Sequence, residues 1–157
     1  MLSHPDNHFL RAAEGWLELG CPMEAVRELD AIHAENQLNP DVLKLRWQIH
    51  ARGGHWEAAL AVAQTITTMT PRISFGWLHL AFSLHELKRT QEAYDTLKPV
   101  LERFHDNWLF RYNLACYSCQ LGKIDEARHW LEHACALGNE QEVRKLASAD
   151  KDLAPLQ

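Results

Sequence analysis

The chain has 157 residues, which is enough for one ordinary domain or for four or five helical repeats of about 30 to 40 residues each. Its composition of 46% hydrophobic and 24% charged residues, with six prolines and seven glycines, is typical of an ordered globular protein and argues against long disordered segments. The net charge of −5 comes from interspersed acidic and basic side chains, which argues against a nucleic-acid partner.

The start of the chain lacks the basic residues and the apolar segment of a signal peptide. The longest apolar run, residues 58–63, is far shorter than the roughly 20 residues that span a bilayer. Four cysteines in a chain of this size do not resemble the framework of a small secreted scaffold, and we expect reduced thiols. These features predict a cytoplasmic protein without a membrane segment.

A 34-residue repeat runs through most of the sequence. One column of this repeat is alanine throughout, without any insertion: Ala25, Ala59, Ala93 and Ala127. Five residues before each alanine lies a turn position, which is glycine in all copies but one: Gly20, Gly54, Lys88 and Gly122. Four residues after each alanine the side chain is again apolar: Leu29, Ala63, Leu97 and Leu131. Small and apolar side chains thus recur where two helices must touch, which indicates a structural period.

Each copy divides at its turn position into two predicted helices, because glycine tolerates the left-handed conformation that ends a helix. Pro22 suits the first turn of a second helix, and Pro40 and Pro71 mark the boundaries that follow. In chain order we expect a lead-in and then successive helix pairs: residues 1–5, 6–39, 40–73, 74–107 and 108–141.

The last residues, 142–157, continue the helical pattern and then break it at Pro155. The end of a helical repeat array needs a polar outer surface. We therefore predict a C-terminal cap and tail in which Leu146, Leu153 and Leu156 cover the last apolar surface while Lys145, Asp150 and Asp152 meet water.

The repeat resembles that of the tetratricopeptide repeat family, a helix–turn–helix unit whose signature includes tryptophan, leucine, a small residue and a closing proline. The matching residues in this chain are Trp77, Leu80, Ala81, Leu114, Ala115 and Pro71. Lys88 departs from the pattern by replacing a turn glycine. The resemblance implies an all-α fold, a right-handed α–α superhelix of about four helix pairs with a C-terminal capping helix. The tail is similar to that of uncharacterised bacterial members of the family.

Proteins of this family bind partners on a concave groove lined by the first helix of each copy. The resemblance implies that the second, fifth, ninth and twelfth residues of each copy face this groove. In the first two copies these positions are mixed and modestly polar: Asn7, Leu10, Glu14, Leu17, Asp41, Lys44, Gln48 and Ala51. In the last two copies they are mostly apolar: Phe75, Leu78, Phe82, His85, Leu109, Tyr112, Cys116 and Cys119.

The apolar groove residues are not needed for the core, because other apolar residues of the same helices already supply it at three- and four-residue spacing. Apolar surface with aromatic anchors usually marks a binding site. We predict that the groove binds another polypeptide, as a peptide or an amphipathic helix. The predicted binding residues are Lys44, Gln48, Phe75, Leu78, Phe82, His85, Leu109, Tyr112 and Cys116. Two alternatives stay open: two copies of the chain bury the patch as a homodimer, or the C-terminal helix folds back over it.

Neither an enzyme nor a cofactor-binding protein is predicted, because the sequence has no phosphate-binding glycine loop, nucleophile elbow or paired catalytic carboxylates. One alternative function is that of the class II chaperones of type III secretion systems, cytosolic repeat proteins of similar length that shield hydrophobic segments. A second is redox or metal chemistry at Cys116 and Cys119, which have Cys-x-x-Cys spacing, or at His129 and His133 on one helix face. Because the cysteine pair lies within a predicted helix, structural thiols are favoured.

Overall fold

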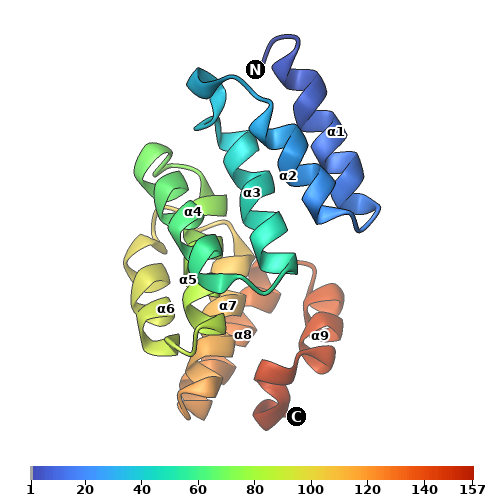
Figure 1. Ribbon diagram of the computed structural model, residues 1–157. Coiled ribbons are helices and arrows are strands. Elements are labelled where there is room, and N and C mark those ends of the chain that lie inside the picture. The colour runs from blue at the N-terminus through green and yellow to red at the C-terminus, as the bar shows by residue number, and fades with distance from the viewer. Residues whose placement is uncertain (1) are drawn as a thin grey trace. The chain divides into compact units, whose positions relative to one another are not determined.

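The computed structural model describes residues 2–157, which form helices connected by tight turns (Figure 1). The chain divides into two compact units, with the division between Pro71 and Arg72. The first unit contains α1 (Asp6–Glu18), α2 (Pro22–Asp30), the 3-10 turn η1 (Ala34–Asn36), α3 (Pro40–Arg52) and α4 (Trp56–Met69). The second contains α5 (Ser74–Glu86), α6 (Thr90–Leu97), η2 (Lys98–Val100), α7 (Trp108–Gln120), α8 (Ile124–Leu137), α9 (Glu140–Ala149) and η3 (Lys151–Leu156). Residues 2–157 contain no β-strand, and the predicted all-α fold of helix pairs is confirmed.

The helices follow the 34-residue period of the sequence. The first helices of the pairs begin at Asp6, Pro40, Ser74 and Trp108, and the second helices at Pro22, Trp56, Thr90 and Ile124. Proline is the first residue of α2 and of α3, where its missing N–H costs nothing and its fixed φ suits the helix. Asparagine caps two of the first helices: the side chain of Asn39 accepts the N–H of Asp41, and that of Asn107 accepts the N–H of Leu109.

The turn within each pair has the same hydrogen bonds in all four copies. After α1, the N–H of Cys21 donates to the carbonyl of Trp16 at 2.9 Å, and the N–H of Gly20 donates to the carbonyl of Leu17 at 3.1 Å. This pair of bonds is the Schellman motif, which requires a left-handed residue directly after the helix. The left-handed residues are Gly20, Gly54, Lys88 and Gly122, with φ between 64° and 76°. Lys88 therefore adopts a glycine conformation although it carries a side chain.

The alanine column lies where the two helices of each pair touch. Ala25, Ala59, Ala93 and Ala127 are all fully buried. A larger side chain at this place would separate the helices, because protein interiors are closely packed. The period recognised in the sequence is thus a period of close helix contacts.

A buried carboxylate ties the first helix to the end of the first pair. Asp6 is only 2% exposed, and its Oδ1 accepts the backbone N–H of His33 at 3.1 Å and lies 2.8 Å from Nδ1 of the same residue. Its Oδ2 accepts the amide of Asn36 at 2.6 Å. These bonds hold the start of α1 against the segment that leads into η1, so the carboxylate stabilises the first pair from its end.

The C-terminal residues pack within the second unit, where α9 contacts α8 and η3 contacts α7 (Figure 1). Leu153 is 1% exposed and covers apolar surface as predicted, whereas Leu146 is 46% exposed and does not. The reason is that α9 buries Val143 and Ala147 instead, which places Leu146 on its outer side. Pro155 lies inside η3, a 3-10 helix that extends to Leu156.

Candidate binding surface

The first helices of neighbouring pairs contact each other within each unit, α1 with α3 and α5 with α7. We call the two resulting surfaces the α1–α3 face and the α5–α7 face. The α1–α3 face contains Glu14, Leu17 and Glu18 of α1 and Lys44, Leu45, Gln48 and Arg52 of α3. The α5–α7 face contains Phe75, Leu78, Phe82 and His85 of α5 and Leu109, Tyr112 and Cys116 of α7. The predicted binding residues thus belong to α3, α5 and α7.

The predicted residues of the α5–α7 face differ in exposure. Phe82 and Leu109 keep 36% and 37% of their surface accessible, and Phe75 is half-buried, with its ring stacked on the imidazole of His79 at a centroid distance of 3.8 Å. The remaining residues are buried: Leu78, His85, Tyr112 and Cys116. Only part of the predicted apolar surface is therefore open to a ligand in this conformation.

Three of the buried residues, His85, Tyr112 and Cys116, contact the C-terminal segment, residues 150–157. The hydroxyl of Tyr112 donates to Oδ2 of Asp150 at 2.8 Å, and Sγ of Cys116 lies 3.7 Å from the same oxygen. Nε2 of Gln120 donates to the backbone carbonyl of Asp152 at 2.9 Å. The C-terminal end of the chain thus folds back over this face, which is one of the alternatives that the sequence leaves open.

His85 connects α5 to the same segment. Its Nε2 lies 2.9 Å from Oδ2 of Asp152, and its Nδ1 lies 3.0 Å from Oγ1 of Thr90. Its ring is also 5.1 Å from the ring of Tyr117. The imidazole is therefore held on both nitrogens, with one of them directed at a carboxylate.

Burial and the carboxylates of Asp150 and Asp152 oppose the ionisation of three nearby side chains of α7, those of Tyr112, Cys116 and Cys119. Burial, followed by the hydrogen bond to Asp150, raises the pKa of Tyr112. Burial and the charges of Asp150 and Asp152 also raise the pKa of Cys116 and of Cys119. Because the thiolate is the reactive form of cysteine, this environment does not support redox chemistry at the Cys-x-x-Cys pair.

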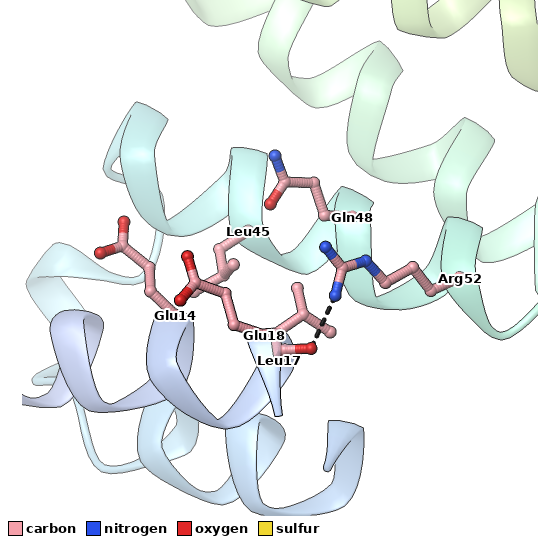
Figure 2. A pocket seen from close by; sticks show the side chains of 6 residues that line it. All are labelled: Glu14, Leu17, Glu18, Leu45, Gln48 and Arg52. Atoms are coloured by element: carbon pink, nitrogen blue, oxygen red, sulfur yellow. Dashed lines mark hydrogen bonds between the residues drawn. The ribbon is translucent and has the colours of Figure 1, made fainter. Parts of the chain in front are cut away.

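The α1–α3 face has a more polar site, a pocket of about 290 Å³. It is lined by Glu14, Leu17, Glu18, Leu45, Gln48 and Arg52. Figure 2 shows the side chains of Glu14, Leu17 and Glu18 on α1 and those of Leu45, Gln48 and Arg52 on α3, with the two carboxylates on the side of Leu45. The guanidinium of Arg52 donates to the backbone carbonyl of Leu17 at 2.6 Å, which joins the two helices at one end of the pocket.

Several residues of these sites are not singled out by the sequence. Glu18 and Arg52 follow Glu14 and Gln48 by four positions, so helical periodicity would extend the predicted stripe to them. The expectation that Asp150 and Asp152 meet water is wrong, because both are half-buried and contact the α5–α7 face. Their place depends on the direction in which α9 leaves α8, and no local pattern specifies that direction.

Two other kinds of feature are absent from the described part of the chain. Within residues 2–157, no group of three or more His, Cys, Asp and Glu side chains is arranged to hold a metal ion. Over the same residues, no helix has both the length and the apolar character needed to cross a bilayer.

No family model matches the sequence, and no curated protein matches it significantly. Several solved structures, in contrast, have a similar fold. A tetratricopeptide repeat protein from Thermus thermophilus is similar with a TM-score of 0.76 and 22% identity, over 96% of this chain and 80% of that protein. MamA from Desulfovibrio magneticus RS-1 is similar with a TM-score of 0.75 and 17% identity, over 89% of this chain and 79% of that one. A further MamA crystal structure has a TM-score of 0.75 at 11% identity, over 89% and 81%. The chain thus has the fold of the tetratricopeptide repeat proteins, as the resemblance of its repeat implies.

Proposed function

We propose that the chain is a non-catalytic protein-interaction module in which the α1–α3 face and the α5–α7 face each bind a segment of another polypeptide. Repeat proteins of this fold bind ligands on the first helices of their pairs, and both faces consist of such helices. The proposed contacts are Lys44 and Gln48 on α3, Phe75, Leu78, Phe82 and His85 on α5, and Leu109, Tyr112 and Cys116 on α7.

The observation that carries the proposal is the contact between the α5–α7 face and the chain's own residues 150–157. A short segment is held there by side chains of two helices, while one apolar side chain, Leu153, is almost completely buried. Receptors bind short peptides in the same way, with polar groups that fix the register and an apolar anchor that supplies the burial. Burial of a leucine side chain contributes about 2 kcal/mol. The contact with the chain's own segment therefore supports peptide binding at this face.

The α1–α3 face supports the proposal through two acidic side chains, Glu14 and Glu18. Among the described residues, neither Glu14 nor Glu18 has an ion-pair partner, and both border the same pocket. Two carboxylates one helical turn apart attract a lysine or arginine side chain, and Leu17 and Leu45 add apolar surface beside them. A segment bound to this face would carry a cation next to an apolar residue.

Selection from a random peptide library on the immobilised full chain tests the proposal. The test variant is Leu109→Glu, which places a charge on the α5–α7 face, and the matched control is Leu137→Glu on α8, where the native leucine is 44% exposed. We expect peptides selected by the native chain to bind Leu109→Glu about tenfold more weakly, a loss of about 1.4 kcal/mol, and to bind Leu137→Glu unchanged. Circular dichroism shows whether both variants fold.

Two results would contradict the proposal for the α5–α7 face. One is that no peptide is enriched, or that the enriched peptides bind both variants equally. The other is that the native mass of the chain halves in Leu109→Glu, because this face would then be a contact between two copies of the chain.

A further inference from the structure

The α5–α7 face contacts the C-terminal segment at two carboxylates that are two residues apart. Asp150 meets Tyr112 and Cys116, which are separated by one turn of α7. Asp152 meets His85 of α5 at 2.9 Å. Asp150 thus contacts α7 and Asp152 contacts α5. The spacing of the two carboxylates along the segment therefore matches the spacing of their partners on the two helices.

Helix capping explains only part of this geometry. Oδ1 of Asp150 accepts the backbone N–H of Asp152 at 2.9 Å, as the first residue of a helical turn commonly does. The other oxygen of Asp150 and the carboxylate of Asp152 contact the face instead, and capping requires neither contact. A segment that served only to cover apolar surface could use apolar residues here, without the desolvation cost of two carboxylates.

The face also contacts the backbone of the segment, because Gln120 donates to the carbonyl of Asp152. Leu153, which follows directly, is 1% exposed and lies beside Leu131 of α8 and Ala147 of α9. Two carboxylates and one main-chain carbonyl are therefore bound by the face, and the leucine is buried next to it within the same unit. The corresponding sequence pattern is Asp-x-Asp-Leu, which in this chain is Asp150-Lys-Asp-Leu153.

The other polar contacts of the segment are local. Gln157 donates to the carbonyls of Ala147 and Ser148, and the N–H of Leu153 donates to the carbonyl of Asp150. Asp150 itself has an extended backbone at the end of α9, with φ of −84° and ψ of 119°. A rotation at this residue would displace the segment from the face; it would break the two bonds from Gln157 to α9 and leave the hydrogen bonds within α9 intact.

We infer that residues 150–157 are a built-in ligand of the α5–α7 face, and that the partner of this face is a protein segment with the pattern Asp-x-Asp-Leu that replaces them. The inference rests on the proposed function and specifies the chemistry of its ligand. A tethered segment competes at a high effective concentration, in the millimolar range for a short flexible connection. The apparent Kd of a partner is therefore its intrinsic Kd divided by the fraction of chains whose tail is displaced.

Fluorescence anisotropy on the full chain tests this inference. The probe is a labelled synthetic peptide with the sequence of residues 149–157, and the control peptide has asparagine in place of both aspartates. The native chain is compared with the Asp150→Asn/Asp152→Asn variant, whose own tail is a weaker competitor. We expect the variant to bind the probe at least about tenfold more tightly than the native chain, and the asparagine peptide at least about tenfold more weakly than the probe.

A second substitution distinguishes recognition from a general loss of structure. Adding Tyr112→Phe to the variant removes the donor to the first carboxylate and leaves the ring in place, so the affinity for the probe should fall while the circular dichroism spectrum is retained. The inference is overturned if the native chain and the variant bind the probe equally, or if the asparagine peptide binds as tightly as the probe. It is also overturned if the native chain is a dimer whose mass halves in the variant, because the tail would then bind a second copy.

The outcomes are separable from those of the peptide selection. If the variant enriches library peptides that lack the acidic pattern, and if these depend on Leu109, the proposed function holds and the inference about the ligand is wrong. If the variant binds the probe but neither chain enriches any library peptide, the tail is a cap specific to its own chain, and the inference about a partner is wrong together with the proposed function.

Discussion

The hydroxyl of Tyr112 donates a hydrogen bond of 2.8 Å to Oδ2 of Asp150, which lies 38 residues further along the chain. The bond joins the middle of α7 to the residue at which α9 ends. Tyr112 is buried and Asp150 is half-buried, so the bond is partly shielded from water. Together with the contacts of His85 and Gln120 with Asp152, it holds residues 150–157 on the α5–α7 face.

Replacing Tyr112 by phenylalanine should loosen the tail without removing the ring. A hydrogen bond to a charged group contributes about 1.5 to 3 kcal/mol when buried, and partial exposure of Asp150 reduces this to about 1 kcal/mol. We expect a loss of that size in the free energy of unfolding, together with faster hydrogen exchange in residues 150–157. Unchanged exchange in this segment would show that the bond does not hold the tail in solution.

Lys88 should be replaceable by glycine with a gain in stability. Its φ of 64° is left-handed, a conformation that costs a side-chain-bearing residue roughly 1 to 2 kcal/mol and glycine little. Glycine in turn loses more conformational freedom on folding, which offsets part of the gain. We expect Lys88→Gly to raise the free energy of unfolding by about 0.5 to 1 kcal/mol, as measured by chemical denaturation.

The matched control for Lys88 is the same turn in the last helix pair. A Cβ added at Gly122 would meet no atom within 4 Å, and φ there is +76°. Gly122→Ala therefore tests the left-handed backbone alone, and it should lower stability by about 1 kcal/mol. If neither substitution changes stability, backbone strain at this position of the repeat is not significant.

These turns also show how far the sequence predicts the fold. A 34-residue period with glycine before a small residue predicts the helix pairs, because backbone freedom and close helix contact are local requirements that residue type reveals. Lys88 occupies the glycine position and yet forms the same turn, since the hydrogen bonds around it, such as that from Arg89 to the carbonyl of Leu84, are made by the backbone. Repeat register thus outweighed residue preference at this position.

The site is less predictable than the fold. The positions of Leu109 and Tyr112 on α7 follow from the repeat, but the difference in their exposure does not, because it depends on where a distant segment packs. The prediction for Leu146 was wrong for the same kind of reason. Its spacing fits an apolar stripe, whereas the rotation of α9 about its axis is determined by contacts of Val143 with the rest of the unit.

The network around Asp6 should make stability depend on acid. Burial alone would raise the pKa of this carboxyl, but the hydrogen bonds from Asn36 and His33 outweigh burial, and the pKa is lowered from its ordinary value of 3.8. A carboxyl with a lowered pKa stabilises the folded state above the unfolded pKa, and this contribution is lost as pH falls through the folded pKa. We expect the free energy of unfolding to decrease below about pH 4.

Asp6→Asn should remove this acid dependence, because the amide does not ionise in that range. It should also lower stability near neutral pH, since the side-chain nitrogen cannot accept the bonds that an Asp6 oxygen accepts. The control is Glu35→Gln in η1, where the native carboxylate is exposed. This substitution should leave the dependence of the free energy of unfolding on pH unchanged. An identical pH profile for the native chain and Asp6→Asn would show that the network does not form in solution.

The thiols provide a direct measure of how often the tail leaves the α5–α7 face. Cys21 is half-buried and should react first with a thiol reagent at pH 8, while Cys116, Cys119 and Cys135 are buried and should react slowly. Burial and the charges of Asp150 and Asp152 raise the pKa of Cys116, and the effect of the charges ends when residues 150–157 are displaced. Asp150→Asn/Asp152→Asn should therefore accelerate the modification of Cys116, as followed by mass spectrometry of the labelled peptides.

Cys135 is the internal control for this experiment. Burial raises its pKa as well, but the charged groups near it are Arg144, Glu132 and Glu140 rather than the tail aspartates. A general loss of structure in the variant would accelerate both thiols, whereas displacement of the tail should accelerate Cys116 and leave Cys135 slow. Equal rates at Cys116 in the native chain and the variant would mean that the two carboxylates do not control access to this face.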